Sequence, residues 1–431
     1  MEHFKDAHYF HIPSQGNIYT VTDLKLANGT PILLAASLKR EIFCIEYLES
    51  SSGFLVSTTK EVSFTYIPSG AEIISIDAFN KSTTNNELVI GITIIKNSSD
   101  SDTLETFLNI YCQLEENEDF DIENIAQNCL NVELNFIPYK LLHTHLITWN
   151  DCSILGKEIV FVLSGSDNQV HIFQENTTDH VYREIDAKEY FPEFGKTASP
   201  VVWIDIQFIN NFEERVTAFG CECGYVKLMK INTKTNKIVY NFSVRFGNYI
   251  SNVYLYREDK IKSKYKIQKI IGVNNSSESA GNSQPILNMI VINSILPAVI
   301  FRDVLTYGLS DYATLPRHDN STILTSCVVA DIDFDDEKEI LLGNSSEEIM
   351  LIKYDKGAKN WFLEELKLIA APVLCIKYID LTGDGVKDLV VFSVKGIHVL
   401  QYDHHYINEQ LNKKIDSVCI PTISNTRESA I

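Results

Sequence analysis

The sequence predicts an all-β protein, a seven-bladed β-propeller formed by residues 1–405. Two observations predict this fold. Apolar residues alternate with period two in runs such as 87–96 (ELVIGITIIK) and 159–173, with small-residue turns between the runs. Units of three or four such runs recur about every 40–50 residues, the repeat length of a propeller blade. Since one blade cannot bury both of its faces, blades packed around an axis can share a core over 400 residues.

The repeated units are recognised by the way they end. The third run of a unit closes on an aromatic residue, as at Tyr47, Phe173, Tyr354 and Tyr402. Further units begin near residues 71, 131, 200 and 248, which gives about seven blades in all. The final unit shows only three clear strands. We therefore expect a strand near residues 8–13 (HYFHIP) to complete the last blade and close the ring.

Few segments predict helices. Residues 121–130 have helical apolar spacing with Asp121 as an N-cap, and residues 301–309 predict a second short helix. Residues 406–431 are expected to form a short amphipathic helix, folded back on the propeller, and then a disordered tail. The apolar stripe of that helix would be Ile407, Leu411 and Ile415.

Two polar stretches predict disordered loops, residues 97–106 and 274–284. Both are rich in Ser and Asn and contain few apolar residues. Because such segments cannot bury enough apolar surface to offset the entropy of ordering, we expect them to be insertions between strands.

Composition excludes several classes of protein. Formal net charge is −20, from 37 Lys and Arg against 57 Asp and Glu, so nucleic-acid binding is not expected. The densest basic stretch, residues 260–269, alternates with apolar residues as the wet face of a strand does. The N-terminal residues lack the apolar region of a secretory signal, and no apolar run approaches the roughly 20 residues of a membrane span. We expect a cytoplasmic protein without membrane insertion.

Cysteines and histidines form no recognisable metal or catalytic set. The nine cysteines are an odd number, and Cys221 and Cys223 are the only close pair, so free thiols in a reducing compartment are expected. His143 and His145 flank Thr144 on one side of a strand without an evident third ligand. The pair His404 and His405 is expected at the surface.

Two acidic loops recur 49 residues apart. In the first, DIDFDDEKE, oxygen-bearing side chains occupy positions 1, 3, 5 and 9; in the second, DLTGDGVKD, they do so again, with Gly385 at position 6. Alternate residues of a tight loop can converge on one cation, and Gly permits the left-handed turn between them. The candidate ligands are Asp331, Asp333, Asp335 and Glu339 in the first loop and Asp380, Asp384 and Asp388, with Thr382, in the second.

The two loops are open to two interpretations. Position 12 is Leu342 in one loop and Val391 in the other, which excludes an EF-hand. The strand–loop–strand spacing instead resembles the FG-GAP repeat of integrin-type propellers, which implies weakly bound Ca²⁺ that stiffens a blade. Alternatively, Asp, Thr and Gly make tight turns without metal by bonding their own backbone amides, and Asp336 stands where the second loop has Gly385. No cofactor is required on either interpretation.

No catalytic motif is present in the sequence. It contains no Gly-x-Ser-x-Gly elbow, no phosphate-binding P-loop and no dinucleotide-binding fingerprint. No convergent set of acids and bases can be assigned to the channel of a propeller. We therefore expect a non-enzymatic protein that uses its rim and loop faces for protein–protein interaction.

Beyond these patterns, the chain resembles the kaptin family. The similarity runs from about residue 9 to residue 405 and includes the helix-like insert and the RDVLTYGL segment. It is strongest in residues 64–82, 107–112, 121–141, 162–176, 297–316 and 380–401. The resemblance implies a scaffold subunit of the KICSTOR complex, paired with a second FG-GAP-type propeller. It further implies that the complex tethers the GATOR complex to lysosomes and restrains TOR signalling when amino acids or glucose are scarce.

Two other functions remain as alternatives. The resemblance also implies association with F-actin at actin-rich cell edges, which could coexist with the scaffold role. An acidic protein that binds acidic filaments would need a local basic patch on its own surface, and residues 260–269 are the candidate. The third hypothesis, an extracellular calcium-stiffened adhesion propeller, is opposed by the absence of a signal peptide and by the odd number of cysteines.

Overall fold

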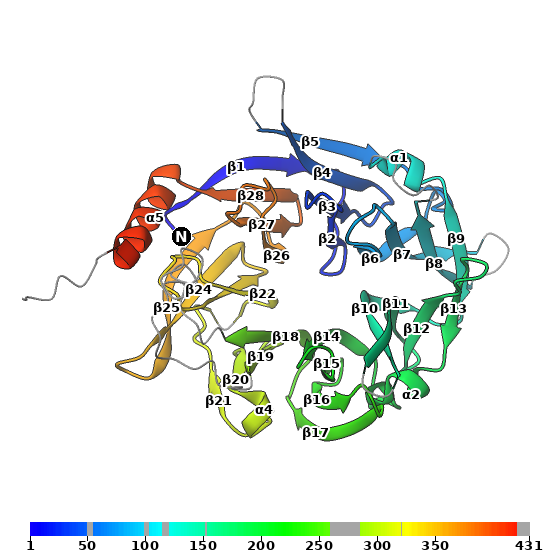
Figure 1. Cartoon of the computed structure of the whole chain (residues 1–431). Helices are drawn as coiled ribbons and strands as arrows, with labels where there is room; N and C mark the ends of the chain where they lie inside the picture. Colours follow the sequence, from blue (N-terminus) through cyan, green and yellow to red (C-terminus); the bar gives the residue numbers. More distant parts are fainter. Residues whose placement is uncertain are drawn as a thin grey trace, which may run out of the picture.

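The computed structural model describes residues 1–49, 55–98, 103–113, 120–150, 153–258, 285–319 and 321–419. This part of the chain contains seven four-stranded antiparallel sheets that succeed one another around a ring (Figure 1). The architecture is all-β and fits a seven-bladed β-propeller. The predicted loop residues 99–102 and 274–284, the basic stretch 260–269 and the tail 420–431 lie outside the described residues.

Six of the sheets use consecutive strands, and each runs outward from the ring in chain order. Their innermost strands contact one another in sequence around the central axis. The first three sheets are β2 (Val21–Lys25), β3 (Pro31–Ala36), β4 (Ile42–Glu49) and β5 (Leu55–Val62); β6 (Glu72–Asn80), β7 (Leu88–Asn97), β8 (Leu104–Cys112) and β9 (Cys129–Leu134); and β10 (Pro138–Asn150), β11 (Ser153–Gly165), β12 (Val170–Glu175) and β13 (Tyr182–Ile185).

The next three sheets follow the same order. They are β14 (Val201–Ile209), β15 (Glu214–Cys221), β16 (Tyr225–Asn232) and β17 (Lys237–Arg245); β18 (Ile250–Glu258), β19 (Ile286–Asn293), β20 (Val299–Phe301) and β21 (Tyr312–Thr314); and β22 (Leu324–Ala330), β23 (Glu339–Asn344), β24 (Glu348–Asp355) and β25 (Asn360–Leu368).

The seventh sheet joins the two ends of the chain. Its inner strands are β26 (Val373–Ile379), β27 (Asp388–Ser393) and β28 (Gly396–Tyr402), and its outermost strand is β1 (Phe4–His11). Strand β1 pairs antiparallel with β28, from Phe4 opposite Tyr402 to His11 opposite Gly396. The hydrogen bonds of the last blade therefore depend on the N-terminal residues.

The hydrophobic core is divided among the contacts between sheets. Seven clusters of buried residues each span two neighbouring sheets, and the last spans the seventh and the first. That last cluster brings Leu33 and Ile45 of the first sheet against Val390, Phe392 and Val399 of the seventh. Since burial of apolar surface stabilises by roughly 25 cal/mol per Å², every blade gains stability from both of its neighbours.

One polar interaction is buried between the third and fourth sheets. Helices α2 (Ala187–Tyr190) and η1 (Pro192–Phe194) carry Glu193 into the interior, where its carboxylate accepts hydrogen bonds from Arg215 Nε at 2.7 Å and Nη2 at 2.9 Å. Thr217 Oγ1 donates a third bond at 2.9 Å. Both charged side chains are buried, so each depends on the other for compensation.

The remaining helices lie in connections between strands or after the ring. Helix α1 (Ile122–Ile125) begins at Asp121, whose side chain accepts a bond from the Glu123 N–H, which confirms the predicted cap. Helix α4 (Val304–Tyr307) lies inside the second predicted segment. No described helix has the length and apolar character that crossing a membrane requires.

Helix α5 (His404–Cys419) follows β28 at the rim of the ring (Figure 1). Its predicted apolar stripe was only partly correct, because Ile407 packs against the core whereas Leu411 and Ile415 are 53% and 44% exposed. Two contacts fix a different rotation of the helix: Tyr406 Oη donates to Asp333 O at 3.0 Å, and Lys414 Nζ lies 3.2 Å from Asp336 Oδ1.

We expect the Glu193→Ala substitution to lower the free energy of unfolding by about 3–5 kcal/mol, because it leaves the Arg215 charge buried without a carboxylate to neutralise it. Chemical denaturation would measure the change. The control is Glu213→Ala, which removes the half-exposed ion pair with Lys234 and should cost no more than about 1 kcal/mol. Equal effects of the two substitutions would contradict the structural role of the buried pair.

Candidate functional site

The acidic loops connect the inner strand to the second strand in the sixth and seventh sheets. Both have the same backbone conformation, since Phe334 and Asp336 adopt φ of 64° and 69° where Gly383 and Gly385 adopt 74° and 89°. The predicted left-handed turn at Gly385 is therefore confirmed, and Asp336 forms the same turn without glycine. The two loops are copies of one structural unit.

Hydrogen bonds from the backbone to the acidic side chains support each turn. Asp331 accepts the Asp336 N–H at 3.1 Å, and Asp380 accepts the equivalent Gly385 N–H at 2.9 Å. The buried carboxylates at position 9 accept the N–H at position 2, from Ile332 to Glu339 at 2.8 Å and from Leu381 to Asp388 at 3.1 Å. Burial raises the pKa of Glu339 to about 8 and that of Asp388 to about 7. These bonds suit a turn that needs no metal.

The first loop also brings its carboxylates together. Asp331, Asp333 and Asp335 each offer an oxygen, and the three oxygens lie within 4.8 Å of one another. Glu339 is not part of this group, and among the described residues no such group includes Asp380, Asp384 or Asp388. Asp333 also forms an ion pair with Lys353. The donor set of the first loop fits a hard cation such as Ca²⁺, and calcium binding at either loop stays a prediction.

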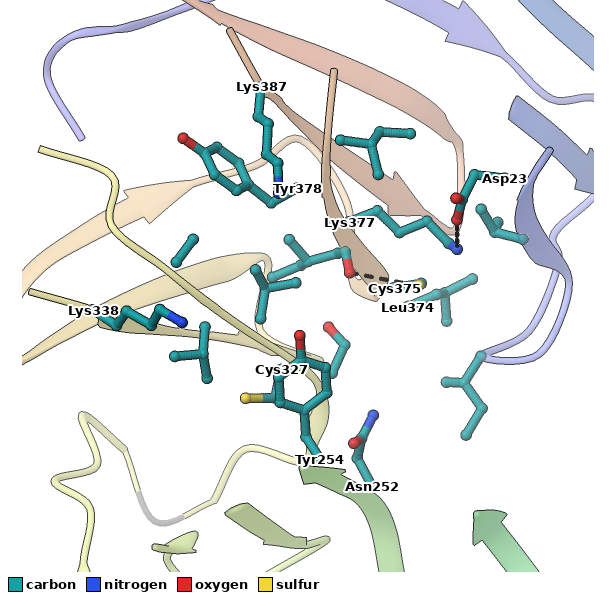
Figure 2. A pocket seen from close by; sticks show the side chains of 18 of the residues that line it. Asp23, Asn252, Tyr254, Cys327, Lys338, Leu374, Cys375, Lys377, Tyr378 and Lys387 are labelled. Atoms are coloured by element: carbon teal, nitrogen blue, oxygen red, sulfur yellow. Dashed lines mark hydrogen bonds and ion pairs between the residues drawn. The ribbon is translucent and has the colours of Figure 1, made fainter. Parts of the chain in front are cut away.

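The inner strands surround a central channel with a cavity of about 690 Å³ (Figure 2). Charged side chains of the inner strands make contacts between neighbouring blades around this channel. Lys377 of β26 forms an ion pair with Asp23 of β2, and His143 Nδ1 of β10 lies 2.8 Å from Asp77 Oδ2 of β6. Lys140 lies over the Trp203 ring at 4.4 Å, and burial lowers the pKa of this lysine. These contacts join neighbouring blades, which assigns the groups a structural role.

Asp205 connects the inner strands of the fourth and fifth sheets. Its Oδ2 accepts the Leu255 N–H at 2.6 Å, and burial raises the pKa of the carboxyl to about 6. This hydrogen bond therefore crosses from one blade to the next.

The outer rim carries exposed apolar side chains. They lie on the outermost strands of several sheets, where one strand edge has no partner in the described chain. The exposed set on these strands comprises Tyr9, Leu55, Val56, Ile238, Val239, Phe242, Tyr312, Phe362 and Leu368. Sequence reasoning missed these residues. Their alternation resembles that of inner strands, and only the strand order within each blade reveals that they face solvent.

The other residues considered from the sequence are dispersed. His145 lies beside Phe208 and Phe212 and not against a metal ligand, whereas His404 and His405 are exposed at the start of α5. Cys221 is buried and Cys223 half-buried, and every cysteine that the structure describes is a free thiol. The basic stretch 260–269, proposed for F-actin, lies outside the described residues.

We expect the loop at 331–339 to bind Ca²⁺ weakly, with a dissociation constant on the order of 10⁻⁴–10⁻³ M, because it offers few charged ligands. Isothermal titration calorimetry would measure it. Asp333→Asn should abolish the binding heat, whereas Asp355→Asn, on an exposed turn, should preserve it. The absence of any calcium-dependent heat in the unmodified protein would leave both loops as metal-free turns.

We expect Asp205 to make the protein less stable as pH rises from 4 to 7. Its folded pKa is raised above the usual 3.8, so the protonated state contributes stability that is complete below that value and is lost as pH rises through about 6. Asp205→Asn should reduce this loss, by up to about 3 kcal/mol at pH 7. Chemical denaturation across the pH range would test it. An identical effect of the exposed control Glu133→Gln would contradict it.

Comparison with known proteins identifies relatives along nearly the whole chain. Residues 4–412 match the family model described as KICSTOR complex protein kaptin. The KICSTOR complex protein kaptin of Mus musculus is 33% identical over 392 residues, covering 90% of this chain and 86% of that protein.

Solved structures also match this chain, at low sequence identity. BBS1N in its crystal structure with ARL6DN, soaked with lead, has a TM-score of 0.50 and 11% identity, over 93% of this chain and 97% of that chain. The structure of the Dos1 propeller has a TM-score of 0.48 and 8% identity, over 93% and 96% of the two chains. These likenesses concern the fold alone, whereas the matches along the sequence show that this chain belongs to the kaptin family of KICSTOR complex proteins.

Proposed function

We propose that this protein is a scaffold subunit of a KICSTOR complex and not an enzyme. The observation that carries the proposal is the family match over residues 4–412, which includes every strand of the ring. A role in assembly is consistent with the structure, because charged side chains of the inner strands, such as Lys377 with Asp23, hold neighbouring blades together. The exposed apolar side chains, by contrast, lie on the rim, where a partner can reach them.

The rim is suited to binding several partners at once. Apolar side chains more than 40% exposed occur on strands of separate blades, including Leu55 on β5, Val239 on β17 and Leu368 on β25. Side chains of this kind at the centre of an interface supply much of its binding free energy. We infer that different blades contact different subunits, among them a second propeller of the FG-GAP type. The same proposal treats the acidic loops of this protein as turns of the FG-GAP type.

The cellular role follows from membership of the complex. The protein would act in the cytoplasm and be recruited to the lysosomal surface with its partners. There the complex would tether the GATOR complex and so restrain TOR signalling when amino acids or glucose are scarce. In this role the chain contributes a binding surface and rigidity. The rigidity comes from the seven interfaces between blades.

We expect the tagged full-length protein, purified from its own cells, to bring down other KICSTOR subunits at near-equal abundance, including a second propeller. Quantitative mass spectrometry would measure the ratios, with the tag alone as the control. Recovery of actin alone, or of no stoichiometric partner, would overturn the scaffold assignment.

In cells that lack the protein, GATOR should leave the lysosome and TOR activity should persist during amino-acid starvation. Unchanged GATOR localisation would contradict the tethering role while leaving membership of the complex intact.

A further inference from the structure

Strand β17 is an unprotected sheet edge. It is the outermost strand of the fourth sheet, it is nine residues long, and most of its side chains are exposed. Ile238, Val239 and Phe242 are each 40% exposed or more. Proteins usually protect such edges by making the strand short, by adding charge or by covering it, since an open edge can pair with another chain.

The backbone groups at this edge can be assigned. Phe246 donates its N–H to Gly224 O at 2.8 Å, toward β16. Successive residues of a strand direct their N–H and C=O groups to opposite sides, and pairing with β16 is regular from Tyr240 to Arg245. The groups of Asn241, Ser243 and Arg245 therefore point away from β16. They form three successive positions at which an added strand could exchange hydrogen bonds.

The two faces of β17 have different chemistry. Tyr240 and Val244 pack against the core toward the fifth blade, and the Phe242 ring lies against Gly308, which follows the exposed Tyr307 of α4. This face continues the apolar surface of the ring to its rim. An added strand would lengthen it by placing every second side chain beside Phe242.

The opposite face carries two basic side chains, Lys227 and Arg245. Lys227 of β16 pairs with Ser243, and Arg245 follows two residues later on the same side. The hairpin from 225 to 246 contains five basic residues (Lys227, Lys230, Lys234, Lys237 and Arg245) and no acidic one, in a chain of net charge −20. Lys230 and Lys234 pair with Glu214 and Glu213. Lys227, Lys237 and Arg245 form no ion pair with any residue that the structure describes.

The other outermost strands differ from β17 in length or in the sign of their charge. Strands β13 and β21 have four and three residues. The longer strands β1, β5, β9 and β25 each carry at least one acidic side chain. On β25, moreover, Glu365 pairs with the N-terminal amine of Met1. Among the outermost strands that the structure describes, β17 alone combines length and exposed apolar side chains with the absence of an acidic residue.

We propose that β17 accepts a fifth strand, supplied by an extended segment of another subunit in which acidic and apolar side chains alternate. The acidic side chains would face Lys227 and Arg245, and the apolar ones would cover Phe242. Backbone hydrogen bonds give such strand addition its affinity, and the alternating side chains give it specificity. This inference rests on the proposed function, because it names how one subunit of the complex is held.

Ser243→Pro tests the edge directly. Its N–H points outward, so proline removes no bond to β16, and proline is tolerated on an edge strand with that orientation. An added strand would lose a hydrogen-bond donor and meet the proline ring. We expect one co-purified subunit to fall by about tenfold relative to wild type, whereas the matched control Ser243→Ala retains it. Because the partner segment is acidic, higher salt should also release that subunit from wild type.

Hydrogen exchange on the wild-type chain provides a readout that needs no substitution. The amides of Asn241, Ser243 and Arg245 should exchange at least about tenfold more slowly in the purified complex than in the free protein. The edge proposal alone is overturned if the wild-type protein captures the subunits, these amides show no protection, and Ser243→Pro loses no subunit. Wild type that captures no subunit overturns the proposed function and the edge proposal together. If Ser243→Pro lowers the melting temperature relative to Ser243→Ala, the exchange result decides.

Discussion

The structure depends on one constraint: a four-stranded sheet has two faces, and both must leave water. No single blade can satisfy it, so each blade buries its faces against its two neighbours, and the seven clusters between blades together form the core. The last interface also includes the N-terminal segment, since residues 4–11 pair with β28 and Ile12 belongs to the cluster between the seventh and the first sheets. The N-terminal strand therefore supports a cluster formed with the first and the last blades alike.

That constraint also determines where partners can bind. Burial of the sheet faces leaves the loop surfaces and the outermost strand edges accessible. In the channel, polar contacts such as Asp205 to Leu255 and Lys377 to Asp23 are used to join blades. Exposed apolar side chains, such as Phe242 and Leu368, lie instead on the rim. The division follows from geometry, since an outermost strand has neighbours on one edge only.

The repeated architecture could be predicted from the sequence, but the side chains that face a partner could not. Period-two runs, aromatic strand ends and the paired loops at 331 and 380 predicted the repeat, because each blade must solve the same packing problem. The stripe Ile407, Leu411 and Ile415 was partly misplaced. The rotation of α5 is set by Tyr406 and Lys414, which contact a loop more than 70 residues earlier in the chain. The Glu193–Arg215 pair was equally hidden, since it joins the connection between two blades to a strand of the next blade.

The two acidic loops show how one backbone can serve different ends. Asp336 adopts the left-handed conformation that Gly385 adopts in the second loop, although a side chain there costs roughly 1–2 kcal/mol. In the first loop this cost is offset by contacts that glycine could not make, since the Asp336 carboxylate lies beside Lys414 of α5. The first loop therefore both turns the chain and holds the C-terminal helix, whereas the second only turns the chain. Substitution of glycine at position 336 would relax the turn and remove the contact with Lys414, so the retained strain is explained by a contact outside the blade.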